Sequence, residues 1–432
     1  MRITASFTVS DIKKFKKELL CWAQQFDEVV WLDSNEKHSQ YGSFDVLLAV
    51  EGLTSIITDQ EGAFNDLREY RTAVKDWIFG YLSYDLKNDV EQLASANTDK
   101  LNFPDLYFFQ PKKVIRIIGN TIDFVYLKMV EDEIEQDFDI ISNGSFHKVD
   151  VIQHTTDIRI KLRIFKDEYF QRVNSILKHI QRGDIYEANF CQEFYAENTE
   201  IDALRTYEKL NTISKAPFAT FLKLFDKYLL CASPERYLRK EGNKIISQPI
   251  KGTARRAANG EEDGRLKIDL EKDTKERAEN IMIVDLVRND LSKSALKGSV
   301  KVEELCKVYT FEQVHHMIST VVATVTPDKN PIDIIKETFP MGSMTGAPKV
   351  SAMQIIERHE AFKRGLYSGA VGYFTPDGDF DFNVVIRSIL YNTTEKYVSY
   401  SVGGAITAKA VPEKEYQECL LKAKAMREVL EN

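Results

Sequence analysis

The spacing of apolar residues predicts an α-helix over residues 166–181. Its apolar face is formed by Tyr169, Phe170, Val173, Ile176, Leu177 and Ile180. The helix is expected to end at Arg182 and Gly183, because a cation in the last turn and a glycine after it are common at helix ends. Further helices are predicted at residues 269–291, at 347–359 and from about residue 412.

Short runs rich in β-branched and aromatic residues predict strands between these helices. The strands are expected at residues 218–224, 228–232, 237–239, 245–250, 368–375, 381–392 and 396–403. The glycine turn at 241–243 is tight enough to join two of them. The first 150 residues are also strand-rich, with a few helices. Strands that alternate with helices predict an α/β protein.

The sequence changes character near residues 145–165, after a cluster of turn-forming residues at 142–147. We therefore expect an N-terminal region over residues 1–150 and a larger region over residues 160–432. Neither an internal repeat nor a long linker separates the two regions. One intertwined α/β body is expected rather than two independent domains.

Composition narrows the class of protein. The chain has 432 residues, of which 43% are hydrophobic and 29% charged, as in a soluble globular protein. Its net charge of −8 is spread along the chain, which disfavours nucleic acid as a partner. The five cysteines are far apart, as expected for buried thiols in a reducing compartment. No signal-type segment and no apolar run of about 18 residues is present, so we expect a cytoplasmic protein without membrane spans.

Lys251 is the strongest candidate for chemistry. It lies between an apolar strand and a glycine turn, in the stretch Gln248-Pro-Ile-Lys-Gly-Thr-Ala-Arg-Arg. A lysine amine is nucleophilic only when neutral, and its usual pKa is about 10.4. Burial, with Arg255, Arg256 or a metal ion nearby, would lower the pKa of Lys251. The alternative is a solvent-exposed lysine at a strand edge.

Glu276 and Glu279 are three residues apart in the predicted helix 269–291 and therefore share a face. Two carboxylates on one face suit Mg²⁺, which takes oxygen ligands and keeps several waters. The alternative is an ordinary solvated helix face.

Residues 341–349 run from a loop into a helix and form a candidate anion site. The N–H groups of the helix start, the Ser343 and Thr345 hydroxyls and the Lys349 ammonium could all face an anion. An ordinary capped helix, with proline near its first turn, is the alternative.

Arg387 is predicted to lie inside a strand, flanked by β-branched residues. A buried guanidinium there needs a partner, and a planar carboxylate of a ligand is a good candidate. His316 either donates to a leaving hydroxyl or is a core histidine with satisfied hydrogen bonds. The glycines in Val402-Gly-Gly-Ala405 allow the backbone to approach a ligand closely.

Together these segments resemble the chorismate-utilising enzymes, which include the anthranilate, aminodeoxychorismate, isochorismate and salicylate synthases. The matching stretches are 31–34, 80–86, 183–189, 233–235, 249–256, 278–290, 342–349, 369–373 and 415–418. The resemblance implies mostly antiparallel sheets, packed as a sandwich and flanked by helices. It makes residues 1–150 the N-terminal region of a synthase component I, and residues 160–432 the chorismate-binding catalytic domain.

Four positions favour the aminodeoxychorismate branch of this family. The resemblance places Lys251 where anthranilate synthases have alanine, and Asn280 where they carry histidine. The turn at 343–346 is closer to the aminodeoxychorismate form. Glu187 stands where isochorismate and salicylate synthases have a water-activating lysine.

The resemblance also implies a reaction. Lys251 attacks C2 of chorismate, the C4 hydroxyl departs, ammonia adds at C4, and the lysine is expelled. The product is 4-amino-4-deoxychorismate, the precursor of 4-aminobenzoate and folate. Glu235 is the implied general acid and base, a role that requires burial to raise its pKa towards neutrality.

The binding residues follow from the same resemblance. Glu279 and Glu418 are implied to hold Mg²⁺, with Glu276 acting through water. Chorismate is implied to contact Gly252, Thr253, His316, Ser343, Thr345, Lys349, Tyr367, Arg387, Gly403 and Ala405. Glu187, Cys191 and Ala405 depart from the residues usual in the family.

Ammonia is expected from a separate glutamine amidotransferase subunit, because the sequence has no Gly-x-Cys-x-Gly nucleophile elbow for a glutaminase. Two other functions are open. One is anthranilate synthase component I, and the other is a non-catalytic chorismate-binding protein.

Overall fold

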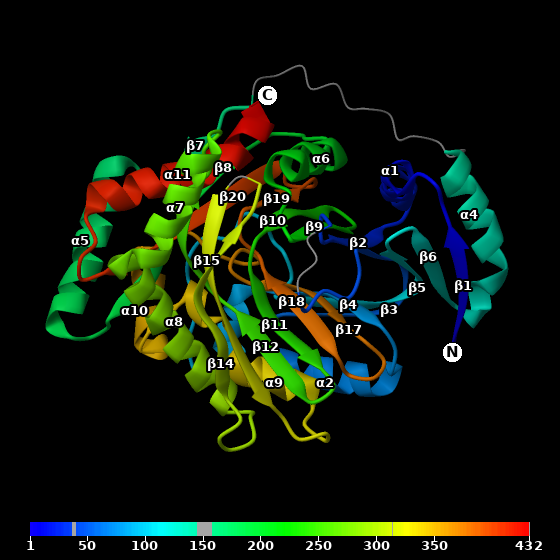
Figure 1. Cartoon of the computed structure of the whole chain (residues 1–432), viewed down its shortest axis with the longest axis horizontal. Coiled ribbons are helices and arrows are strands. Elements are labelled where there is room, and N and C mark those ends of the chain that lie inside the picture. Colours follow the sequence, from blue (N-terminus) through cyan, green and yellow to red (C-terminus); the bar gives the residue numbers. More distant parts are fainter. Residues whose placement is uncertain (37–39, 145–157, 313, 432) are drawn as a thin grey trace.

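The structure is a computed structural model that describes residues 1–36, 40–144, 158–312 and 314–431. In this part of the chain, eleven α-helices surround a twenty-stranded sheet whose paired strands run antiparallel (Figure 1). The predicted fold class, an α/β body with mostly antiparallel strands flanked by helices, is confirmed. No helix of the described residues is long and apolar enough to cross a bilayer.

The strands and helices have the following bounds. The strands are β1 Arg2–Thr8, β2 Glu28–Asp33, β3 Val46–Thr58, β4 Ile78–Leu82, β5 Leu106–Ile118, β6 Thr121–Leu127, β7 Lys161–Leu162, β8 Glu187–Ala196, β9 Phe218–Leu224, β10 Lys227–Ser233, β11 Arg236–Glu241, β12 Lys244–Gln248, β13 Ile250–Arg255, β14 Lys301–Thr310, β15 Val314–Thr324, β16 Gly346–Ala347, β17 Ala370–Phe374, β18 Phe380–Val384, β19 Ser388–Asn392 and β20 Tyr397–Thr407. The α-helices are α1 Ile12–Ala23, α2 Ala63–Val74, α3 Lys87–Val90, α4 Ile134–Asn143, α5 Lys166–Arg182, α6 Ala203–Ser214, α7 Gly260–Lys272, α8 Thr274–Ser292, α9 Pro331–Thr338, α10 Lys349–His359 and α11 Pro412–Glu431. Three short 3-10 helices are η1 Tyr84–Leu86, η2 Lys128–Glu133 and η3 Gly342–Met344.

Strands from the two ends of the chain pair with each other. In the N-terminal region β2 pairs with β9, and β4 pairs with β17. The two regions therefore share one sheet and interlock, as the absence of a linker predicted. The expected boundary between residues 150 and 160 lies mostly outside the described residues.

The sheet has a hydrophobic core on each face. Along β2, Val30 and Leu32 contribute to one core, while Val29 and Trp31 contribute to the other. Successive strand residues point to opposite faces, so these two cores lie on opposite sides of the sheet. The first core also packs against α2, α8 and α9, and the second against α1, α4, α5, α6 and α11.

The predicted helix 269–291 is in fact two helices, α7 and α8, that meet at Asp273. The Asp273 side chain accepts hydrogen bonds from the N–H groups of Lys275 and Glu276 and so caps α8. Hydrophobic spacing continues across this junction, but the aspartate three residues before a glutamate is a readable N-cap signal.

Other boundaries also differ. The predicted strand 381–392 is β18 and β19, which are separated at Arg387, a residue in the left-handed region with φ 53°. Strand 245–250 is broken at Pro249 into β12 and β13. Helix α10 begins two residues later than expected, with Pro348 at its cap. In the turn cluster 142–147, the first two residues belong to α4 and residues 145–147 lie outside the described residues.

Candidate active site

Lys251 lies on β13 with only 15% of its side chain exposed, so it is not a solvent-exposed strand-edge lysine. Its Nζ is 3.3 Å from Oε1 of Glu187, a buried residue on β8. Burial lowers the pKa of Lys251, but Glu187 and Glu279 raise it by more, so its pKa is above the usual value. The expectation of a depressed pKa is therefore wrong. Arg255 and Arg256 donate to carboxylates of α7 instead.

Asn280 of α8 fixes the backbone beside Lys251. Its Nδ2 donates to the carbonyl of Lys251 at 3.2 Å and to that of Met317 at 3.3 Å. Gly252 has φ +97°, and a Cβ there would lie 3.2 Å from Oε2 of Glu276. Only glycine accommodates both this conformation and this close approach. Helix α8 is thus held against β13, which brings its acidic face to Lys251.

Glu235 lies at the junction of β10 and β11 and is 5% exposed. Ser343 Oγ, in η3, donates to its Oε1 at 2.6 Å. Burial raises the pKa of Glu235 to about 7, against the lowering effects of Ser343 and Lys251. A carboxyl group with this pKa can both donate and accept a proton near neutral pH.

Four glutamates of two helices lie close enough to influence one another's pKa values, and two of them, Glu279 and Glu418, also raise the pKa of Lys251. Glu276 and Glu279 come from α8, and Glu415 and Glu418 from α11. Burial is the main cause of the raised pKa of Glu279, which Glu418 raises further. Burial and Glu418 together raise the pKa of Glu415 to about 7. Sequence spacing could not place Glu418 close to α8, and it did not single out Glu415 at all.

These oxygens suit a divalent cation that is bound partly through water. Among the described residues, no three His, Cys, Asp or Glu side chains converge closely enough to hold a metal by themselves. However, Oε2 of Glu187 is buried without a hydrogen-bond partner among the residues that the structure describes, and the pKa of Glu276 is raised by burial and by Glu279. Mg²⁺ keeps several waters and shares ligands with bound anions, so an incomplete set of carboxylates fits it.

Arg387 and His316 line a cavity of about 240 Å³ that also includes Lys422 of α11. In the part of the chain that the structure describes, the Arg387 guanidinium makes no ion pair and no hydrogen bond. Burial lowers the pKa of His316 to about 3, with a further lowering by Arg387. His316 is therefore neutral, with Nδ1 2.9 Å from Thr253 Oγ1. The cavity therefore presents the Arg387 guanidinium to a ligand, with Glu418 close enough to oppose the lowering of the pKa of Arg387 by burial.

Gly403 packs closely against Cys191, because a Cβ at this position would lie 2.4 Å from Cys191 Sγ. The Tyr367 hydroxyl donates to the same sulfur at 3.7 Å. Lys422, which sequence reasoning missed, donates to the Gly403 carbonyl at 2.8 Å and pairs with Glu418 at 2.7 Å. Ala405 follows on β20, opposite Asn189 of β8.

Lys349 is turned away from this site. Its Nζ donates to Asp290 at 2.6 Å and to the carbonyls of Pro340 and Thr338 at 2.9 and 3.1 Å. The three acceptors leave no proton for an anion. The Thr345 hydroxyl likewise donates to two carbonyls of its own turn. Both side chains are thus engaged inside the protein and do not face a ligand.

A larger cavity, of about 550 Å³, lies beside the N-terminal region. It is lined by Asp33 and Ser34 together with Arg236 and Tyr309, and it contains none of the candidate catalytic side chains. Size alone therefore does not identify the reacting centre. The candidate reacting centre is instead the group of polar side chains around Lys251 and Glu235.

Comparison with known proteins identifies the family of the chain. The chain matches the model of chorismate binding enzymes over residues 11–428. A probable chloroplastic aminodeoxychorismate synthase of Oryza sativa is 37% identical over 387 residues, which cover 82% of this chain and 43% of the rice protein. Anthranilate synthase component 1 of Thermus thermophilus is 32% identical over 360 residues, which cover 82% of this chain and 77% of that protein.

The fold is shared with anthranilate synthase component I of Streptococcus pneumoniae, at a TM-score of 0.77 and 24% identity over 90% of this chain and 94% of that one. The chain spans less than half of the rice protein. Relatives from the two aminating branches are similar to it at comparable identity, so likeness alone does not choose between the branches. The family itself is established: the chain belongs to the chorismate-binding enzymes.

Proposed function

We propose that the chain is an aminodeoxychorismate synthase component I, which converts chorismate and ammonia to 4-amino-4-deoxychorismate and water. The observation that carries the proposal is the place of Lys251. Its amine is buried 3.3 Å from Glu187 and close enough to Glu235 and Glu279 to influence their pKa values. A lysine so placed can serve as a nucleophile that divides one displacement into two easier steps.

The proposed reaction has two displacements. The Lys251 ammonium first gives a proton to the Glu187 carboxylate, 3.3 Å away. The neutral amine then bonds to C2, both ring double bonds shift, and the C4 hydroxyl leaves with a proton from Glu235 as water. Ammonia then bonds to C4 and gives a proton to the Glu235 carboxylate, while the two double bonds shift back and expel the lysine amine from C2. The freed amine takes its proton back from Glu187. Glu235, with a pKa of about 7, suits both proton transfers.

Binding is assigned to the remaining residues. Arg387 and Tyr367, with the backbone at Gly403 and Ala405, would hold one carboxylate of chorismate. Contacts to the ring would come from Gly252, Thr253, His316 and Ser343. The carboxylates of Glu279, Glu418 and Glu276 would hold Mg²⁺, which when bound neutralises the other carboxylate of the substrate.

A glutamine amidotransferase subunit is proposed as the source of ammonia, and it would meet a surface of the chain outside the site described above. Free ammonium salts supply some neutral ammonia at mildly alkaline pH. They should therefore replace this subunit in vitro.

One observation favours a second function, anthranilate synthase component I. The carboxylates around Lys251 raise its pKa and so favour its ammonium form. If it stayed protonated with substrate bound, C2 would be open to ammonia, and anthranilate and pyruvate would follow.

The experiment that tests the proposal is product analysis by mass spectrometry. The protein is incubated with chorismate, Mg²⁺ and ammonium at mildly alkaline pH, with wild type beside Lys251→Ala. Aminodeoxychorismate from wild type, lost in the variant or replaced by anthranilate, supports the lysine mechanism. Anthranilate from wild type would establish the second function, and binding of chorismate without turnover would indicate a non-catalytic protein.

A further inference from the structure

Arg364 is buried behind the candidate active site and joins two of its walls. Its side chain is 1% exposed. Nη1 donates to the carbonyl of Met344 at 2.7 Å, and Nη2 donates to the carbonyl of Asn189 at 2.7 Å. Met344 follows Ser343 in η3, while Asn189 lies two residues from Glu187 on β8. One guanidinium therefore ties the turn that contacts Glu235 to the strand that faces Lys251.

Glu360 fixes the orientation of this guanidinium. Its two carboxylate oxygens accept from Arg364 Nε at 2.8 Å and from Nη2 at 2.6 Å. The oxygen that faces Nη2 also accepts from the N–H of Cys191 at 2.9 Å, which adds a second link to β8. A planar, two-pronged pair of this kind defines direction as well as distance.

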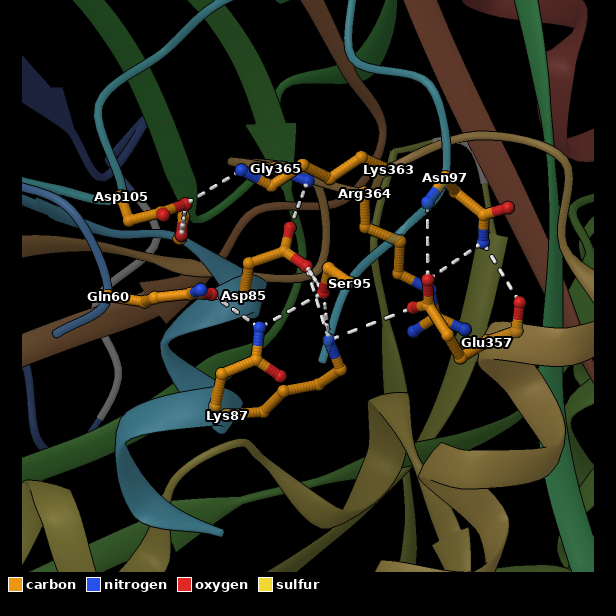
Figure 2. A network of polar contacts seen from close by, with 12 residues as sticks. Gln60, Asp85, Lys87, Ser95, Asn97, Asp105, Glu357, Lys363, Arg364 and Gly365 are labelled. Atoms are coloured by element: carbon orange, nitrogen blue, oxygen red, sulfur yellow. Dashed lines mark hydrogen bonds and ion pairs between the residues drawn. The ribbon is translucent and has the colours of Figure 1, made fainter. Parts of the chain in front are cut away.

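The segment that carries Arg364 is held from its other side by the N-terminal region, as Figure 2 shows. The N–H of Gly365 donates to Asp85 at 2.9 Å, and Lys363 pairs with Asp105 at 3.3 Å. Buried Lys87 lies 3.2 Å from Asp85 and 3.8 Å from Glu357. The N-terminal region thus sets the place from which Arg364 reaches the candidate site.

We infer that Arg364 is a positioning residue of the active site, which holds residues 342–345 against β8 and thereby keeps Ser343 within hydrogen-bond distance of Glu235. The inference rests on the proposed acid–base role of Glu235. It does not depend on which aminated product is formed.

The effect of this contact can be measured on Glu235 itself. Ser343 and the charged neighbour Lys251 lower the pKa of Glu235, while burial raises it to about 7. If the turn loosens, the Ser343 hydrogen bond weakens and the pKa of Glu235 rises. A lost hydrogen bond to a carboxylate corresponds to a rise of roughly one pH unit.

The test is a titration of Glu235 by NMR of protein labelled with 13C at glutamate Cδ. The Glu235 signal is identified by its absence in Glu235→Gln. Arg364→Lys and Glu360→Gln are each expected to raise the midpoint by about one pH unit, as is Ser343→Ala. The matched control is Arg163→Lys, which alters an arginine that pairs with Glu193 on the same strand β8 at 2.8 Å. The control should leave the midpoint unchanged.

A double variant shows whether Arg364 acts through Ser343. Arg364→Lys combined with Ser343→Ala should shift the midpoint no further than Ser343→Ala alone. Additive shifts, or a midpoint that does not move in Arg364→Lys and Glu360→Gln, would overturn the inference. Should Arg364→Lys fail to fold, Glu360→Gln decides, because it keeps the guanidinium and an acceptor for Cys191.

This titration needs no turnover, so it remains informative even if the proposed function is wrong. If Glu235 is also the acid and base of the reaction, the pH profile of chorismate consumption should move by the same amount. Arg163→Lys again serves as the control, with an unchanged profile.

Discussion

Two buried lysines, Lys251 and Lys349, differ in how completely their ammonium groups are satisfied. Lys349 has three acceptors within 3.1 Å, and burial lowers its pKa despite Asp290. Lys251 pairs with Glu187 alone at 3.3 Å among the described residues, but several carboxylates near it raise its pKa. A lysine whose three protons are engaged joins structural elements. One with few contacts can move towards a ligand, and a neighbouring carboxylate can take its proton.

The difference predicts opposite effects when each lysine is removed. Lys251→Ala should lower formation of aminodeoxychorismate by about a thousandfold or more, because the nucleophile is lost. Lys349→Met should leave turnover per folded molecule within about twofold of wild type. Steady-state rates, normalised to the folded fraction seen by circular dichroism, measure both. Comparable rates for Lys251→Ala and wild type would remove the distinction.

The free energy of unfolding should show the opposite order, with a larger effect from removal of Lys349 than of Lys251. Lys349→Met removes the shorter of the two ion pairs of buried Asp290 and leaves it with Lys293 at 3.4 Å. We therefore expect a loss of about 1–3 kcal/mol in the free energy of unfolding. Urea denaturation measures it. The control is a double variant, Lys349→Met with Asp290→Leu, which should recover part of the loss because the buried carboxylate is then removed as well. A loss below about 1 kcal/mol for Lys349→Met would show that this lysine is not a structural link.

The carboxyl groups beside the two lysines can be compared in the same way: Glu235 is buried close to Lys251, and Asp290 pairs with Lys349. Glu235→Gln should slow turnover by about 10²–10⁴-fold and abolish the part of the pH profile that titrates near pH 7. Initial rates between pH 5.5 and 9 give both values. Asp290→Asn, at the other lysine, is the matched change and should leave the shape of the profile intact. A pH dependence near 7 that persists in Glu235→Gln would assign it to another group.

Local spacing along the sequence predicts helices and the residues that share a helix face. It predicts little about which distant residues a side chain contacts. Helix α5 and the shared face of Glu276 and Glu279 follow from helical periodicity, and the structure has both. The prediction that Lys349 binds an anion came from a motif that resembles an anion site. In the folded protein its ammonium donates instead to an acceptor distant in sequence, Asp290. The break at Arg387 was also invisible, because apolar residues continue through it and only the folded chain imposes its left-handed backbone.

The smallest expected effect concerns the acidic surroundings of Lys251. Glu415 has a pKa of about 7 in the folded protein, above the ordinary 4.5 that the unfolded chain retains, so the folded state binds more protons between these values. Stability should therefore fall as the pH rises from about 4.5 to 7, by no more than about 3 kcal/mol from this group. Glu415→Gln should reduce that slope, and Mg²⁺ added at pH 8 should restore stability in wild type more than in Glu279→Gln. Thermal unfolding across this pH range measures both effects. If Glu415→Gln leaves the slope unchanged, burial and the neighbouring carboxylates do not raise the pKa of Glu415 enough for it to bind a proton in this pH range. The contrast between the two lysines would then rest on hydrogen-bond saturation alone.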